Sequence, residues 1–242
     1  LYFDSSITTP FHFVTVSGVA ESPSNPVGGL SYINGDFDRG VRYMKELGVD
    51  YFISYTDSIT DKAIMSNELE NLFHSSPFTV FKIYSDKVKV VDAEVINFSQ
   101  PELVERISNS IFKQEKTDSF FNLAMKEFKL DNKKRIIEGI DTEELQIQNR
   151  LPSKKSEINN VRISNNEITF ETDHPNELHI VKVSYFPNWK IENGSGPYRL
   201  SPSFMGVIPY SNEVSITFEN TSLEKSLNII SLIIFLLTAY LL

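Results

Sequence analysis

The chain of 242 residues is long enough for one large domain or two small ones, and it has no cysteine, which excludes disulfides and thiolate ligands or nucleophiles. Its 40 % hydrophobic and 23 % charged residues exclude a disordered chain. The net charge of −9 argues against a nucleic-acid partner and against docking on an anionic lipid surface, because both need clustered Lys and Arg. No signal peptide is visible after Leu1, so we expect a piece of something longer.

The first part of the chain predicts a small α/β unit over residues 1–128. Residues 36–48 are expected to form a helix, in which Asp36 or Asp38 caps the start and Gly48 follows the end. Seven other elements are expected from apolar periodicity: strands over residues 11–16, 49–55, 78–84 and 88–98, a helix from Asp57 or Ser58 to about Phe73, and helices over residues 101–114 and 119–130. The later strands are expected to share one sheet.

The second part differs in kind. Residues 129–155 are strongly polar and charged, which indicates a linker or a partly ordered connection. Residues 156–221 hold short alternating runs separated by turn signals such as Asn193–Gly194, a pattern typical of an antiparallel β-sandwich. The predicted fold class is therefore α+β: the α/β unit, the sandwich and then a C-terminal helix.

The last 17 residues, 226–242, carry no charge. As a helix they would span about 25 Å, whereas a bilayer core is about 30 Å thick and takes about 20 residues to cross. We interpret the run as a transmembrane helix cut before its far end, so a lipid bilayer is the expected partner. The alternative is a buried core helix, which usually shows a polar stripe. The flank 219–225 is not basic, so residues 1–225 are expected on the extracytosolic side of a cell membrane.

No catalytic, cofactor or metal site is expected from the sequence. The four histidines show no metal-ligand spacing. Paired acids at Asp36/Asp38, Asp57/Asp61 and Glu68/Glu70 have the residue types for acid–base catalysis, but helix capping and dipole compensation explain them better. Phosphate-binding glycine loops and nucleophile-elbow motifs are missing.

The stretch SYFPNWKIENGSGPYRL, residues 184–200, holds the only tryptophan. Trp189, Tyr198 and Arg199 are the candidates for carbohydrate contact, because an aromatic ring stacks on a sugar face while a cation binds its hydroxyl groups. The alternative is that Trp189, which restarts a strand after a Pro-containing corner, fills the end of a small hydrophobic core.

The motifs SYFPNWK and YRLSPSFMGVIPYSNEVSITFE, followed by an apolar helix, resemble the extracytosolic tail of the YfhO-like membrane proteins. They are equally similar to the tail of the 6-pyruvoyl-tetrahydropterin-synthase-related membrane proteins. FDRGVRYMKELGVDYFISY and PFTVFKIY resemble the soluble region just before that tail. The resemblance covers residues 8–84 and 180–242.

This resemblance implies a multi-spanning protein of the GT-C glycosyltransferase type, which transfers a sugar from a polyprenyl-phosphate carrier. The catalytic acids of that type lie in an early loop that this chain does not contain, so no catalytic residue is carried over. The expected role of this piece is to position an acceptor or glycan. Two alternatives stay open: a non-catalytic, membrane-anchored ectodomain that binds a partner or a cell-surface polymer, and a soluble hydrolase whose last helix is part of the core.

Overall fold

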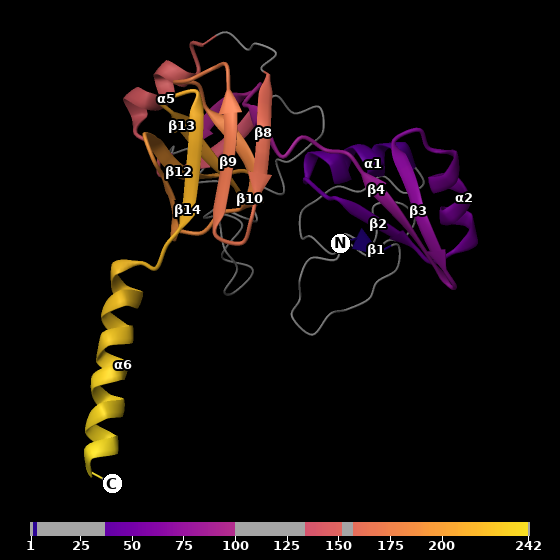
Figure 1. The fold of residues 1–242 in the computed structure, drawn as a ribbon. Helices are drawn as coiled ribbons and strands as arrows, with labels where there is room; N and C mark the ends of the chain where they lie inside the picture. Colours follow the sequence, from indigo (N-terminus) through magenta and orange to yellow (C-terminus); the bar gives the residue numbers. More distant parts are fainter. Residues whose placement is uncertain (1, 4–36, 100–133, 152–156, 242) are drawn as a thin grey trace, which may run out of the picture.

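The computed structural model describes residues 2–3, 37–99, 134–151 and 157–241 (Figure 1). These residues form an α+β fold with three sheets, each antiparallel or mixed, so the predicted fold class is confirmed at this level. The expected strand at 11–16 and the expected helices at 101–114 and 119–130 lie outside the described residues.

The first unit contains a four-stranded sheet with the order β1-β2-β4-β3 and two helices. Its elements are β1 (Tyr2–Phe3), α1 (Phe37–Glu46), β2 (Tyr51–Ser54), α2 (Asp57–Met65), β3 (Leu69–Ser75) and β4 (Phe78–Ile83). Strand β1 runs parallel to β2, whereas the other neighbours are antiparallel. The predicted sharing of one sheet by β2 and β4 is confirmed.

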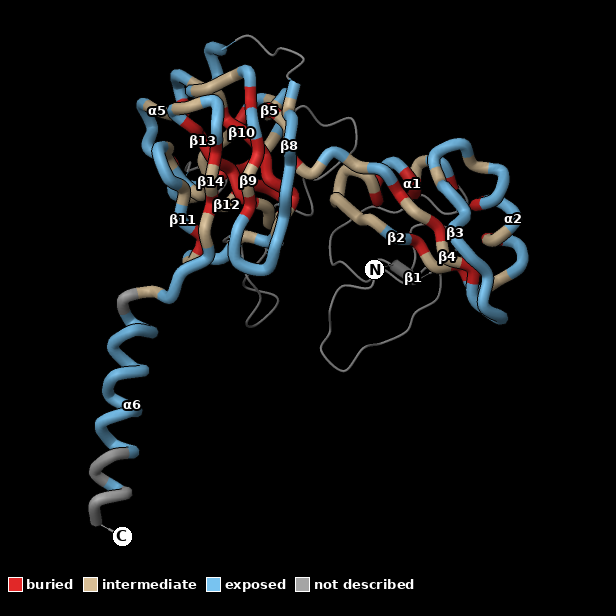
Figure 2. The backbone as a smooth tube through the Cα atoms, in the orientation of Figure 1, coloured by how far each residue is buried: buried red, intermediate tan, exposed pale blue. Residues whose placement is uncertain are grey.

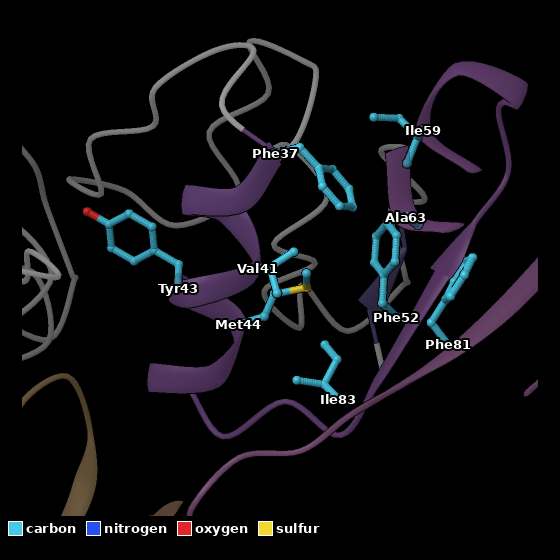
Figure 3. Packing of buried hydrophobic residues seen from close by; sticks show 9 residues of the cluster. All are labelled: Phe37, Val41, Tyr43, Met44, Phe52, Ile59, Ala63, Phe81 and Ile83. Atoms are coloured by element: carbon cyan, nitrogen blue, oxygen red, sulfur yellow. The ribbon is translucent and has the colours of Figure 1, made fainter. Parts of the chain in front are cut away.

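Helix α1 and the sheet of the first unit enclose one hydrophobic core (Figure 3). Val41 and Met44 face the sheet from α1, and Phe52 of β2 packs against Phe81 of β4 with ring centroids 6.0 Å apart. Phe37 meets Phe52 edge to face at 6.1 Å. The periodic apolar residues of α1 therefore do what their spacing predicts, because they all reach the same buried face.

The end of α1 was predictable from its glycine. Gly48 has a φ of +69°, its N–H donates to the carbonyl oxygen of Lys45, and the N–H of Val49 donates to that of Met44. This pair of hydrogen bonds is the Schellman arrangement, which needs a left-handed residue just after the helix. The prediction that Gly48 follows the helix end is confirmed.

The second predicted helix is too long. Helix α2 ends at Met65, and residues that were expected to continue it form β3, which pairs with β4. Its expected apolar side included Ile64 and Leu72, and both side chains are exposed. Only Ile59 and Ala63 of α2 are buried. Pairing with β4 gives β3 its backbone partners, and this non-local contact outweighs the local helical pattern.

The two-sheet unit is defined here as strands β5 to β14 with helix α5. A six-stranded mixed sheet has the order β5-β10-β13-β12-β7-β6, and a four-stranded antiparallel sheet has the order β11-β14-β9-β8. The elements are β5 (Val88–Val90), β6 (Glu94–Asn97), β7 (Lys134–Glu138), α5 (Thr142–Gln148), β8 (Ile158–Ile163), β9 (Glu167–Thr172), β10 (His179–Ser184), β11 (Trp189–Ile191), β12 (Gly194–Leu200), β13 (Phe204–Pro209) and β14 (Glu213–Phe218).

Two segments enter this unit against expectation. The single strand predicted over residues 88–98 is two strands, β5 and β6, and neither pairs with the sheet of the first unit. Within the expected linker, residues 134–138 form β7, which pairs in parallel with β6 and antiparallel with β12, and residues 142–148 form α5. Its charged residues make β7 resemble a linker in the sequence. Ile136 and Ile137 of this strand are nevertheless buried, and their burial stabilises β7 in the sheet.

Buried residues run along the strands of the two-sheet unit (Figure 2), and they form two separate clusters. One cluster fills the space between the sheets, with Ile168 and Ile216 from one sheet and Val181 and Met205 from the other. The second cluster lies on the opposite face of the six-stranded sheet, where Leu145 of α5 covers it. Successive side chains of a strand point to opposite faces of the sheet, so the strands of the six-stranded sheet contribute residues to both clusters.

Helix α6 (Ser222–Leu241) leaves the end of β14 and projects away from the two-sheet unit (Figure 1). Its start is capped, because the carboxylate of Glu224 accepts hydrogen bonds from the N–H and hydroxyl of Thr221 at 2.6 and 2.8 Å. The side-chain amide of Asn188 donates to the same carboxylate at 2.7 Å and to the carbonyl oxygen of Glu219 at 3.1 Å. The corner before β11 is thereby tied to the first turn of α6.

Candidate functional site

Trp189 lies in the core between the two sheets. Its side chain is 6 % exposed and belongs to the cluster that contains Val181 and Ile216. Its ring meets Phe218 edge to face, with centroids 5.1 Å apart. This position corresponds to the core alternative that the sequence left open, since a buried indole has no free face to offer a sugar.

Tyr198 and Arg199 are neighbours on β12, so their side chains take opposite faces of the six-stranded sheet. Tyr198 packs on the layer beside α5, and its hydroxyl donates to a carboxylate oxygen of Glu144 at 2.5 Å. Burial raises the pKa of Tyr198, and the hydrogen bond to Glu144 raises it further. Arg199 lies 3.8 Å from Glu138 on β7. The three predicted contact residues therefore do not converge on one surface.

A polar groove lies on the outer face of the four-stranded sheet, with a volume of about 760 Å³. Its walls come from the outward positions of β8, β9 and β14 and from the turns at residues 192–193 and 211–212. Outward residues of these strands are polar because the inward ones fill the core. A groove of this size falls in the range that holds small ligands.

Three charged side chains in the polar groove, Arg162, Glu192 and Glu213, make no hydrogen bond or ion pair to the described residues. Glu213 faces Glu171 directly across the strand pair, and Glu171 accepts a hydrogen bond from Asn160 at 2.8 Å. Like charges in this position repel. The groove therefore turns a hydrogen-bond donor, Arg162, and two acceptors, Glu192 and Glu213, toward solvent. Such a surface suits a ligand with many hydroxyl groups.

A second surface is the aromatic face of the first sheet, formed by Tyr51, Tyr55, Phe73 and Phe78. The strand register places these residues on the side opposite Phe52, and their side chains are 36–56 % exposed. Tyr55 and Phe78 have ring centroids 5.6 Å apart, and the ammonium group of Lys82 lies 4.3 Å from the Tyr51 ring centroid. Exposed rings of this kind offer flat apolar surfaces for stacking.

A buried polar pair joins β9 and β10. Thr172 Oγ1 lies 2.7 Å from Nε2 of His179, whose Nδ1 lies 2.7 Å from the carbonyl oxygen of Glu177. The geometry fits a neutral imidazole that donates from Nδ1 and accepts the threonine hydroxyl at Nε2. Burial lowers the pKa of His179 to about 4. Both ring nitrogens are occupied, so this histidine is a structural group.

Within the part of the chain that the structure describes, no group of three or more His, Asp or Glu residues is arranged to hold a metal ion. The sequence pointed to neither the polar groove nor the aromatic face. Strand alternation would have marked the outward positions of β9 and β14, but the pairing of these strands with each other required the structure. Comparisons of the chain with protein-family models, with curated proteins and with solved structures found no match.

Proposed function

We propose that α6 attaches the protein to a lipid bilayer, that the two-sheet unit is a β-sandwich, and that it and the first unit lie on the extracytosolic side. The single observation that supports this is the bare apolar surface of α6. All described side chains from Leu223 to Phe235 are exposed, including eight large hydrophobic ones that are 51–68 % exposed. In water this surface is unfavourable by about 25 cal/mol per Å².

The structure does not support the transmembrane span that the sequence predicted over residues 226–242. None of the helices in the described ranges has both the length and the apolar character for crossing a membrane. The proposal rests on the apolar character of the helix on all its sides, which an amphipathic surface helix would lack. The absence of a basic flank next to α6 supports extracytosolic placement of the two units.

The attachment is tested by flotation of the full chain with neutral phosphatidylcholine vesicles. Replacing Ile230 and Ile233 of α6 by Lys is expected to abolish co-flotation, because charged groups are unfavourable in the hydrocarbon layer. The matched control places Lys at Ile64 and Met65, two exposed apolar residues of α2, and is expected to float. An unmodified chain that stays dissolved in water without vesicles or detergent would contradict the proposal.

The function proposed for the whole protein is sugar transfer from a polyprenyl-phosphate carrier, with this piece positioning the acceptor or glycan. The motif resemblance supports the reaction class, and the polar groove supports the positioning role. Arg162 and Glu213, whose side chains have no partner among the described residues, supply a donor and an acceptor for sugar hydroxyl groups. Trp189, buried in the core, is not part of this proposed surface.

The second candidate is a non-catalytic ectodomain that binds a cell-surface polymer, and the aromatic face favours it. Both candidates are tested on one array of oligosaccharides with the full chain in detergent. Loss of binding in Glu213→Gln, but not in Glu167→Gln on the same sheet outside the groove, supports the groove. Loss in Tyr55→Ser supports the aromatic face. Retention in both variants, or no binding by the unmodified chain, contradicts glycan positioning.

A further inference from the structure

The end of helix α1 is docked against cations from the two-sheet unit and from the connection that precedes it. Lys182 of β10 donates from its ammonium group to the carbonyl oxygen of Lys45 at 2.8 Å. Lys87 donates to the carbonyl oxygen of Gly48 and lies 2.7 Å from the carboxylate of Asp50. These cations meet the helix end that carries the negative pole of the macrodipole.

Glu46, the last residue of α1, is the centre of the contact. Lys89 of β5 reaches both of its carboxylate oxygens, at 3.0 and 3.1 Å, and Arg135 of β7 lies at 3.4 Å. Lys182 is only 8 % exposed. Two cations from two different strands, Lys89 and Arg135, thus bind one carboxylate across the boundary between the units, and the charge of Lys182 from a third strand acts on it without direct contact, in a site that is partly withdrawn from water.

Among the residues that the structure describes, other charged groups near this contact are Asp86 and Lys87, in the connection between β4 and β5, Asp50 before β2, and Lys82 at 3.8 Å from Asp50. Lys87 is neutralised by Asp50, and Asp86 also attracts Lys182. Only four residues, 84–87, connect the first unit to β5. A short chain connection restrains the distance between the units but not their relative angle.

We infer that Glu46 is the residue that locks the first unit to the two-sheet unit, and that neutralising it converts a fixed junction into a hinge. With Glu46 uncharged, Lys89 would lose the carboxylate that it reaches through both oxygens, and the attraction of Arg135 and Lys182 to that carboxylate across the junction would be lost with it. Leaving buried charges without their partner is far more costly than the intact contact is favourable. The inference does not depend on the membrane or glycan proposals.

Acid is expected to open the junction, and alkali is not. Burial raises the pKa of Glu46, but Lys182, Lys89 and Arg135 together outweigh this and hold it below its usual value. A carboxylate with a lowered pKa stabilises the docked state above its free pKa, and the stabilisation is lost as pH falls. Burial lowers the pKa of Lys182 to about 8, so its loss of a proton relieves desolvation and gives no reason for release.

The test measures the distance between the two units in the full chain. The protein has no cysteine, so Asp61→Cys on α2 and Glu167→Cys on β9, both exposed, place one spin label on each unit. Pulsed electron spin resonance in detergent is expected to give one narrow distance peak near neutral pH. Glu46→Gln is expected to replace this peak with a broad distribution.

The matched control is Glu68→Gln, which removes an exposed carboxylate paired with Lys45 inside the first unit and is expected to keep the narrow peak. Near-ultraviolet circular dichroism shows whether each variant is folded. If Glu46→Gln does not fold, the distance is measured in Lys89→Gln instead, because the side chain of Lys89 is 32 % exposed. A broadened distance peak is expected for this variant too. A narrow peak in every folded variant that lacks one of these two side chains would overturn the inference.

Discussion

Replacing the buried His179 by Gln should change how the stability of the two-sheet unit depends on pH. The imidazole is fully buried between β9 and β10, and burial holds its pKa at about 4, below the ordinary 6.5. An unfolded chain therefore takes up a proton at His179 earlier than the folded chain does. As pH falls from 6.5 toward 4, this difference favours unfolding, and below 4 it adds nothing more.

The size of the effect follows from the separation of the two pKa values. From 6.5 to about 4 is a difference of about 2.5 pH units, and each unit corresponds to about 1.4 kcal/mol. Protonation of His179 should therefore remove about 3 kcal/mol of stability by pH 4. That loss is a large fraction of the roughly 5–15 kcal/mol that stabilises a folded domain.

Urea unfolding of the full chain in a mild detergent, followed by Trp189 fluorescence, measures this loss between about pH 7.5 and pH 4. The free-energy gap between the native chain and His179→Gln should shrink by about 3 kcal/mol over that range, because the glutamine does not titrate. The control Phe170→Leu alters a ring 5.8 Å from the imidazole, and its gap should stay constant. A constant gap for His179→Gln as well would refute the reasoning.

Three further changes should lower the free energy of unfolding, each measured by urea denaturation with circular dichroism. Trp189→Ala should cost about 3–5 kcal/mol, since it empties a site between the sheets. Gly196→Ala should cost at least about 1 kcal/mol, because φ is +103° and the new Cβ would lie 2.8 Å from the carbonyl oxygen of Gly206. Tyr198→Phe should cost about 1–3 kcal/mol, because it removes the hydrogen bond to the carboxylate of Glu144.

Local signals predicted the parts of the fold that local interactions decide. The apolar spacing of α1 and the glycine after it are both contained in residues 37–48, and they gave the right helix and the right end. Strand β3 was missed because its structure depends on pairing with β4, and β7 was missed because its parallel partner β6 ends more than thirty residues earlier. Contacts between distant segments leave no periodic pattern in either one.

The candidate sites also combine features that the local sequence predicts with features that depend on contacts between distant segments. Alternation along β12 alone implies that Tyr198 and Arg199 point to opposite faces, so the sequence contained an argument against grouping them. The contact around Glu46 had no such signal, since Lys89 lies 43 residues away and Arg135 lies 89 residues away. Ordinary polar residues at such separations become recognisable as a cluster only when the sheet brings their strands together.

The hydrogen bonds of Asn188 couple the first turn of α6 mechanically to the four-stranded sheet. Only residues 219–221 join β14 to the helix, a span of at most about 10 Å, and the amide of Asn188 holds that span at Glu219 and Glu224. A tilt of the helix axis is therefore expected to pull on the four-stranded sheet through these hydrogen bonds, so that a force on the helix reaches the strands that line the polar groove.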